Sequence, residues 1–294
     1  MSKVITKLYG GLGNQMFQYA VGRSLSLALN KQLLIDTSSF ESYTLRAFEL
    51  DCFLLQPVIA EKEVMDRILY SASPIRMIYH YLKIFAKNGS IPIRKYNEPH
   101  FHFDPNVFLQ HGNIYLDGYW QSERYFKDVE HAIRNDFRFK QEPDPLNNDL
   151  IQKMGRECSV SLHIRRGDYV ADERSNAVHG TMGIEYYKNA VQYIAEREAK
   201  PQFYIFSDDR QWIEQNFKIP FPTTFICHNT GSKSYEDIRL MSMCKHNIIA
   251  NSSFSWWGAW LNNNANKIVI APKKWFNDPA KDTKDLIPES WIKL

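Results

Sequence analysis

The sequence lacks the features of several protein classes. Its four cysteines are widely spaced among 294 residues and form no CxxC pair, which argues against a disulfide framework. They are expected to be reduced core residues, as in a cytoplasmic protein. No run of about 18 apolar residues occurs, so no membrane-spanning helix is expected. No apolar stretch of sufficient length follows Lys3 and Lys7, so no secretory signal is expected either.

Common catalytic and nucleotide-binding motifs are missing as well. The sequence contains no GxxxxGK[ST] phosphate loop, no GxSxG nucleophile turn and no HExxH metal motif. The turn at residues 10–13 (GGLG) departs from GxGxxG, because Met16 occupies the last glycine position. Lys and Arg number 36 against 33 Asp and Glu, a net charge of +3 without dense basic patches. A nucleic-acid partner is therefore not expected.

One segment leaves the question of membrane contact open. Residues 75–87 (IRMIYHYLKIFAK) are aromatic and basic, a composition found in buried helix faces and in helices that lie on a membrane surface. A buried face is the commoner use of such a pattern. Peripheral contact with the inner face of a membrane stays an alternative, and the oligomeric state is not indicated.

Strand and helix patterns alternate along much of the chain. In the first half, strands are expected at residues 4–9, 33–35 and 114–116, and helices at 14–30, 61–71, 76–87 and 122–134; residues 97–105 are expected to form an irregular loop. The polar segment 141–148 (QEPDPLNN) is expected to be a linker. Later strands at 160–164, 203–206, 224–227, 246–250 and 267–271 alternate with helices at 185–198, 212–217, 235–243 and 254–261. This rhythm predicts an α/β protein with two Rossmann-like domains, residues 1–145 and 146–294.

Residues 163–168 (HIRRGD) follow a buried strand and form the most unusual local pattern. Two adjacent arginines at a buried strand end are costly to place without an anionic partner. Their guanidinium groups match phosphate or carboxylate in a bidentate way, and Gly167 allows a close backbone approach. The pattern therefore indicates an anion site, with a purely structural Arg–Asp pair as the alternative.

Two further polar segments follow strands of the second domain. Because the carboxyl ends of parallel strands meet at one edge of a sheet, residues 207–209 (SDD) and 251–253 (NSS) are expected there too. The NSS segment opens a helix whose N–H groups either bind an anion or are simply capped. The SDD segment could accept N–H groups of guanine, bind a metal or cap a helix. The nearby Trp256, Trp257 and Trp260 are expected to pack in the core.

Three motifs together resemble one known family. Residues 10–20 (GGLGNQMFQYA), 163–170 (HIRRGDYV) and 249–257 (IANSSFSWW) are strongly similar to bacterial α-1,2-fucosyltransferases of glycosyltransferase family 11. The resemblance implies a GT-B fold of two facing Rossmann-like domains, the first on the acceptor side and the second binding GDP-fucose. It also implies an inverting, metal-independent transfer of L-fucose from GDP-β-L-fucose to the 2-hydroxyl of galactose. The acceptor would be a bacterial surface polysaccharide or a Lewis-type glycan.

The resemblance also assigns roles to residues. Arg165 would hold the β-phosphate, and Asn14 would reach the leaving group from the first domain. The other residues expected to bind the donor are Gly13, His163, Arg166, Asp208, Asn251, Ser252, Ser253 and Phe254. No metal and no other cofactor is expected.

The general base is left open. Asp168 is the first candidate, but it could equally orient Arg165 or Arg166. Asp172, Glu173 and Glu185 are alternatives, and a loose ion-pair mechanism needs no strong base.

Two other functions fit the same motifs. One is a binding module for sugar nucleotides or glycans that has lost catalysis, although such a module would not need a base candidate. The other is a transferase that uses GDP-mannose or a different nucleotide sugar.

Overall fold

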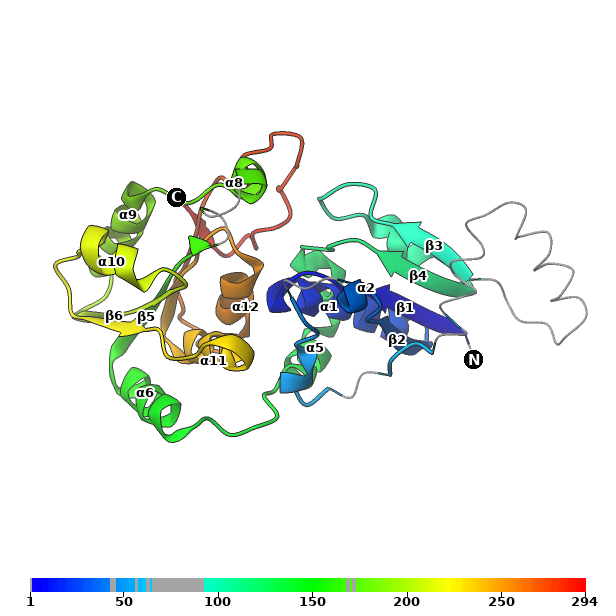
Figure 1. The fold of residues 1–294 in the computed structure, drawn as a ribbon, viewed down its shortest axis with the longest axis horizontal. Coiled ribbons are helices and arrows are strands. Elements are labelled where there is room, and N and C mark those ends of the chain that lie inside the picture. The colour runs from blue at the N-terminus through cyan, green and yellow to red at the C-terminus, as the bar shows by residue number, and fades with distance from the viewer. Residues whose placement is uncertain are drawn as a thin grey trace, which may run out of the picture. The chain divides into compact units, whose positions relative to one another are not determined.

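The computed structural model describes residues 2–42, 46–55, 58–61, 64, 93–167, 170 and 173–294. The chain divides into two compact units, Met1–Arg138 and Phe139–Leu294, each built around its own parallel sheet (Figure 1). The division falls after Arg138, whereas the sequence placed it after residue 145. Apart from residues 61 and 64, the helices expected at 61–71 and 76–87 lie outside the described residues.

The first unit contains a four-stranded sheet with the order β2-β1-β4-β3. Its strands are β1 (Lys3–Lys7), β2 (Gln32–Asp36), β3 (Ile93–Asn97) and β4 (Asn113–Asp117). Helix α1 (Leu12–Ala28) joins β1 to β2 and packs closely on the sheet, since a Cβ at Gly22 would lie 2.9 Å from the Leu33 side chain. On the opposite face, Ile5, Leu34 and Tyr115 form a small core.

Short elements complete the first unit. They are α2 (Ser39–Ser42), α5 (Glu130–Asp136) and the 3-10 helices Leu50–Cys52, Pro105–Leu109, Glu123–Tyr125 and Lys127–Val129. The helix expected at residues 122–134 is thus two 3-10 turns followed by α5. Ser122 caps the first turn by accepting the N–H of Arg124 at 3.3 Å.

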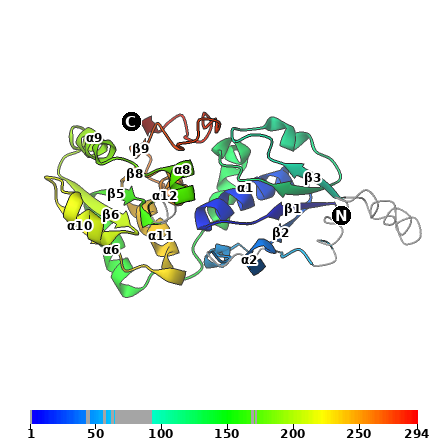
Figure 2. The same cartoon turned by 45° about the horizontal axis from the view of Figure 1, so that its top comes forward.

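The second unit contains a six-stranded parallel sheet with the order β10-β9-β8-β5-β6-β7. The strands are β5 (Cys158–Ile164), β6 (Pro201–Ser207), β7 (Thr223–Ile226), β8 (His246–Ile248), β9 (Val269–Ala271) and β10 (Ile292–Lys293). The helices are α6 (Pro145–Arg156), α8 (Glu173–His179), α9 (Ile184–Ala195), α10 (Arg210–Asn216), α11 (Tyr235–Met243), α12 (Ser253–Leu261) and the 3-10 helix Gly231–Lys233. Figure 2 shows the same elements from a second direction.

Both faces of this second sheet are apolar. Along β6, Phe203 and Ile205 pack toward α9 and α10, while Tyr204 and Phe206 pack toward α6 and α11. This alternation follows from the period of two residues in a strand, and burial on both faces is typical of parallel sheets. The tryptophans of α12 are buried, as the sequence predicted.

The polar segment 141–148 is not only a linker. Helix α6 begins inside it, at Pro145, because Asp144 accepts the N–H of Asn147 at 3.0 Å and proline is well tolerated in the first helical turn. This helix belongs to the second unit, which begins at Phe139.

Candidate functional site

The predicted anion site lies where β5 and β6 end. The two strands are paired in parallel, with His163 opposite Phe206 and Ile164 opposite Ser207. Both strands therefore end at the same edge of the sheet, where residues 163–167 lie beside residues 207–209. Figure 1 shows these strand ends in the second unit.

Each arginine of the motif pairs with one aspartate of the neighbouring strand end. Arg165 Nη1 lies 2.8 Å from Asp208 Oδ2, and Arg166 Nε lies 3.2 Å from Asp209 Oδ2. The Arg166 guanidinium also lies over the Trp212 ring, 3.7 Å from its centroid. The sequence left a single structural Arg–Asp pair as the alternative; the structure has two, and their aspartates belong to the neighbouring strand end. The pairs hold both guanidinium groups in place.

Asp208 also holds the backbone after β5. Its Oδ1 accepts the N–H groups of Arg166 at 2.9 Å and Gly167 at 3.0 Å. A Cβ at Gly167 would lie 2.7 Å from Asp208 Oδ2, so any side chain at this position would displace the carboxylate. The sequence predicted that Gly167 lets the backbone approach a ligand closely; in the structure the group close to Gly167 is the Asp208 carboxylate.

Burial and charge set the protonation states at the strand end. Burial lowers the pKa of His163 to about 4, and the charge of Arg165 acts in the same direction, so the ring is neutral near pH 7. Burial opposes ionisation of Asp208, but Arg165 and the two backbone N–H groups outweigh it and hold the pKa of this carboxyl below its usual value. The site thus contains a neutral imidazole and a firmly ionised Arg–Asp pair.

The start of α12 lies beside His163. The Phe254 ring centroid is 6.0 Å from that of His163, and Ser252 is the residue that precedes the helix. Asn251 is buried and donates through Nδ2 to the carbonyl groups of His179, Gly180 and Trp275, at 2.9, 3.1 and 3.1 Å. Asn251 therefore ties the start of α12 to two other chain segments, while Ser252, Ser253 and Phe254 form the helix start that the sequence expected.

The predicted residues of the first unit lie in the first turn of α1. Gly13 is buried there, and Asn14 Oδ1 accepts a hydrogen bond from Gln121 Nε2 at 2.8 Å. Gln121 follows β4, so the amide pair joins the loops after β1 and β4 at one edge of the first sheet.

Of the four candidates for the general base, the structure describes the side chain of Glu185 alone. Asp168 and Asp172 lie outside the described residues, and so does the side chain of Glu173. Glu185 stands in the first turn of α9, where its side chain is 78% exposed and 3.1 Å from Lys188 Nζ. This carboxylate therefore lies at the surface, paired with a half-exposed lysine.

One carboxyl group near this edge was missed by the sequence analysis. Asp237 lies in the first turn of α11, the helix that follows β7, and it accepts a hydrogen bond from Asn229 Nδ2 at 2.8 Å. Burial raises the pKa of Asp237 to about 7, against the effect of this hydrogen bond. Perturbed carboxyl groups often mark functional sites. The only signal in the sequence was an acidic pair at a helix start.

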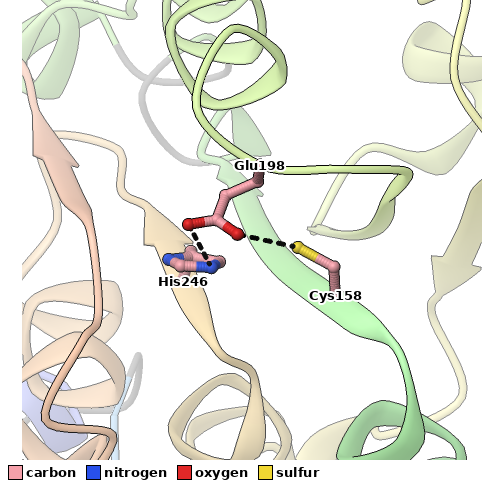
Figure 3. Close-up of side chains that lie close together, drawn as sticks. All are labelled: Cys158, Glu198 and His246. Carbon is pink, nitrogen blue, oxygen red and sulfur yellow. Dashed lines mark hydrogen bonds and ion pairs between the residues drawn. The ribbon is translucent and has the colours of Figure 1, made fainter.

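Among the described residues, one group of Cys, Glu and His side chains is close enough to share a metal ion (Figure 3). Cys158 Sγ and His246 Nε2 lie 3.7 and 3.6 Å from the two carboxylate oxygens of Glu198. His246 Nδ1 accepts the backbone N–H of Ile268 at 3.0 Å, so the neutral ring carries its proton on Nε2. A metal ion at Nε2 would have to displace that proton, and the group therefore suits hydrogen bonding better than metal binding. Cys158 is the first residue of β5 and His246 the first residue of β8, so the group lies at the sheet edge opposite His163.

Comparison with known proteins places the chain in a family. The model of Glycosyl transferase family 11 matches residues 2–294. The chain belongs to glycosyl transferase family 11. Membership agrees with the three sequence motifs and makes the protein a glycosyltransferase.

Two curated relatives illustrate the family. An alpha-1,2-colitosyltransferase of Escherichia coli is 35% identical to this family 11 protein, over 100% of this chain and 99% of the relative. The human galactoside alpha-(1,2)-fucosyltransferase 1 is 26% identical over 50% of this chain and 42% of the human enzyme.

Solved structures show the fold. The alpha-1,6-fucosyltransferase NodZ from Bradyrhizobium, in crystals soaked with GDP-fucose, superimposes with a TM-score of 0.53 over 88% of this chain and 92% of NodZ. Sequence identity is 15%, so the likeness concerns the fold alone. The protein has the GT-B fold of this class, as the sequence predicted. No described helix is long and apolar enough to cross a membrane.

Proposed function

We propose that this family 11 protein transfers L-fucose from GDP-β-L-fucose to the 2-hydroxyl of a galactose residue, with inversion at the anomeric carbon. The observation that carries the proposal is Arg165, whose guanidinium is held by Asp208 at 2.8 Å beside a neutral, buried His163. A permanent positive charge at the end of a central parallel strand is suited to the diphosphate of a nucleotide sugar.

The chemistry explains why a fixed cation is useful here. As the bond between C1 and the phosphate oxygen breaks, the β-phosphate of GDP gains negative charge and the sugar becomes oxocarbenium-like. A cation that is already in place stabilises that charge more in the transition state than in the ground state. The start of α12 adds backbone N–H groups of the same polarity. We therefore propose that the transfer needs no metal.

The remaining predicted residues divide by their contacts. Arg166, Asp208 and Asp209 hold one another and Trp212, so we assign them to positioning Arg165 and the loop that follows β5. His163 and residues 252–254 remain donor-binding candidates, with Gly13 and Asn14 in the first unit. Asp168 stays the first candidate for the base that takes the proton of the acceptor hydroxyl.

A second donor is favoured by one observation. The relative that covers the whole chain at 35% identity is a colitosyltransferase, and colitose is the 3-deoxy counterpart of fucose. The same anomeric chemistry would serve either sugar, because the two differ only at C3. The acceptor in both cases would be a galactoside of a surface polysaccharide.

A donor panel tests the proposal. GDP-fucose, GDP-colitose and GDP-mannose are each incubated with a galactoside acceptor such as lactose, in excess EDTA, and the product linkage is determined. We expect an α-1,2-linked fucoside. Activity restored only by Mg²⁺ or Mn²⁺, or transfer from GDP-mannose alone, would contradict the proposal.

The role of Arg165 has its own variant. Arg165→Ala should lower kcat on the order of 10²-fold or more, because the charge that stabilises the departing GDP is lost. Arg197→Ala is the matched control, since Arg197 is an exposed arginine of the same unit that contacts Glu196 at 3.4 Å. Equal kcat values in the two variants would show that Arg165 does not stabilise the departing GDP.

A further inference from the structure

The edge of the first sheet where Asn14 and Gln121 lie carries a second feature, at the carboxyl ends of β1, β4 and β3. Two tyrosines follow these strands, Tyr9 after β1 and Tyr119 after β4. Their rings meet edge to face, with centroids 5.0 Å apart and planes at 69°. Tyr119 is 38% exposed, so part of a ring that packs on a neighbouring ring remains open to solvent.

The loop that carries Tyr119 is held in a strained conformation. Trp120 has a φ of 58°, in the left-handed region that a bulky side chain rarely adopts. Glu98 stabilises this geometry, because its two carboxylate oxygens accept the N–H groups of Tyr119 at 2.8 Å and Trp120 at 2.9 Å. A Cβ at Gly118 would collide with Glu98, so the chain can pass this carboxylate only as glycine.

Trp120, the residue after Tyr119, holds the loop to the core. Trp120 is fully buried and packs on Tyr96 and Tyr125, with ring centroids 6.3 and 5.4 Å away. Backbone strain persists where the surrounding structure enforces it, and such strain gathers at binding sites. The arrangement keeps one tyrosine of the loop at the surface while its neighbour is fixed in the core.

The charged groups around the tyrosines largely cancel. Asp117 Oδ2 lies 3.4 Å from Lys7 Nζ and 2.9 Å from Lys95 Nζ, and Glu98 adds a second carboxylate. A rigid aromatic face bordered by carboxylates and ammonium groups suits a neutral ligand with many hydroxyls. A galactose ring fits this description, since one of its faces presents C–H groups and its rim presents hydroxyls.

We infer that Tyr119, supported by Tyr9, is the stacking surface for the galactoside acceptor. This inference rests on the proposed function, which requires an acceptor sugar. It adds the residues that select that sugar. Asp117 and Lys7 border the surface and are placed to hydrogen-bond the hydroxyls at the sugar's rim.

Kinetics of Tyr119 variants test the inference. Tyr119→Ala should raise the KM for lactose roughly 10-fold, through loss of the stacked ring, and leave the KM for the donor unchanged. Tyr119→Phe keeps the ring and should stay within about twofold of the wild type. Phe225→Ala is the matched control, because Phe225 is 37% exposed on β7 of the other unit and should change neither KM. An unchanged KM for lactose in Tyr119→Ala would overturn the inference.

Direct binding separates this inference from the proposed function. Saturation-transfer NMR of lactose with the wild-type protein, in the absence of donor, should show stronger transfer to galactose C–H protons than to glucose protons. The signal should disappear in Tyr119→Ala, with unchanged GDP binding as the check of folding. Lactose binding at Tyr119 without sugar transfer would refute only the proposed function. Absence of galactose saturation in the wild type, or its persistence in Tyr119→Ala, would refute the stacking surface.

Discussion

At the scale of single residues, His163 is a titratable side chain that is almost entirely removed from water. It is 5% exposed, at the end of a buried strand and near the Arg165 charge. In the folded protein its pKa is about 4, against an ordinary value of 6.5. Between pH 4 and 6.5 the His163 ring is therefore protonated in the unfolded chain and neutral in the folded protein. Stability contributed by the neutral ring is therefore lost as the pH falls from 6.5 to 4.

This linkage gives a prediction for pH-dependent unfolding. His163→Gln removes the titrating group, so wild type should lose about 2–3 kcal/mol more unfolding free energy than the variant between pH 7.5 and pH 4.5. Urea unfolding at the two pH values, followed by circular dichroism, measures the difference. Parallel losses in both proteins would mean that His163 is solvated and titrates normally.

A single functional residue was predictable from the sequence where burying its side chain without a partner would cost free energy. Arg165 was identified because a guanidinium at a buried strand end demands a partner. Asp208 could not be assigned as that partner, because its contacts depend on the register between β5 and β6, whose paired residues are 43 positions apart along the chain (Cys158 opposite Pro201). Tyr119 was missed for a similar reason, since its exposure follows from a loop geometry that Glu98 imposes.

At the scale of elements, Arg166 and Gly167, which follow β5, lie against the end of β6 through Asp208. Gly167→Ala would place a methyl group 2.7 Å from Asp208 Oδ2 and disturb the contact between Asp208 and Arg165. We expect kcat to fall about 10-fold or more, because misplacement of a catalytic charge is costly. Gly155→Ala in α6 is the matched control.

The control has a clear expectation of its own. A Cβ at Gly155 meets nothing within 4 Å, so the substitution should leave kcat unchanged and stabilise the helix by about 0.5–1 kcal/mol. Assays of both variants beside thermal unfolding distinguish local crowding from a general glycine effect. A Gly167→Ala enzyme with wild-type kcat would show that the Asp208 contact is dispensable.

Elements were predictable where apolar residues recur with the right period. The strands and helices expected after residue 158 are all present, because both faces of that sheet are buried and its strands are apolar. Strand β3 was missed, since it is an edge strand of sequence IRKYN whose charged side chains hide any alternation. Helix α6 was missed because its start has two prolines and polar caps.

At the scale of the whole molecule, the two units share one architecture but display different side chains at the carboxyl edges of their sheets. Each has a parallel sheet and its own core, and each has polar loops at the carboxyl edge. The edge of the second sheet presents arginines held by aspartates, and that of the first presents tyrosines among balanced charges. The alternation of strands and helices predicted this repetition, but only the structure showed which side chains each edge displays.

The pairing of the arginines has a consequence for how a nucleotide arrives. Arg165 and Arg166 are neutralised by Asp208 and Asp209, and the whole chain has a net charge of only +3. Electrostatic steering needs an uncompensated field that extends beyond the Debye length, about 10 Å in 0.1 M salt. The association rate constant of a fluorescent GDP analogue should therefore change less than about threefold between 0.05 and 0.5 M NaCl.

Stopped-flow measurement of that rate has an internal control. Asp209→Asn removes the charge opposite Arg166 but keeps a side chain that can cap α10 as Asp209 does, through the N–H of Trp212. Its association rate should become faster and more sensitive to salt than that of wild type. A steep salt dependence in wild type would show that the site attracts GDP from a distance. With compensated charges, GDP instead meets the site by unguided diffusion, and selectivity among anions arises only at contact.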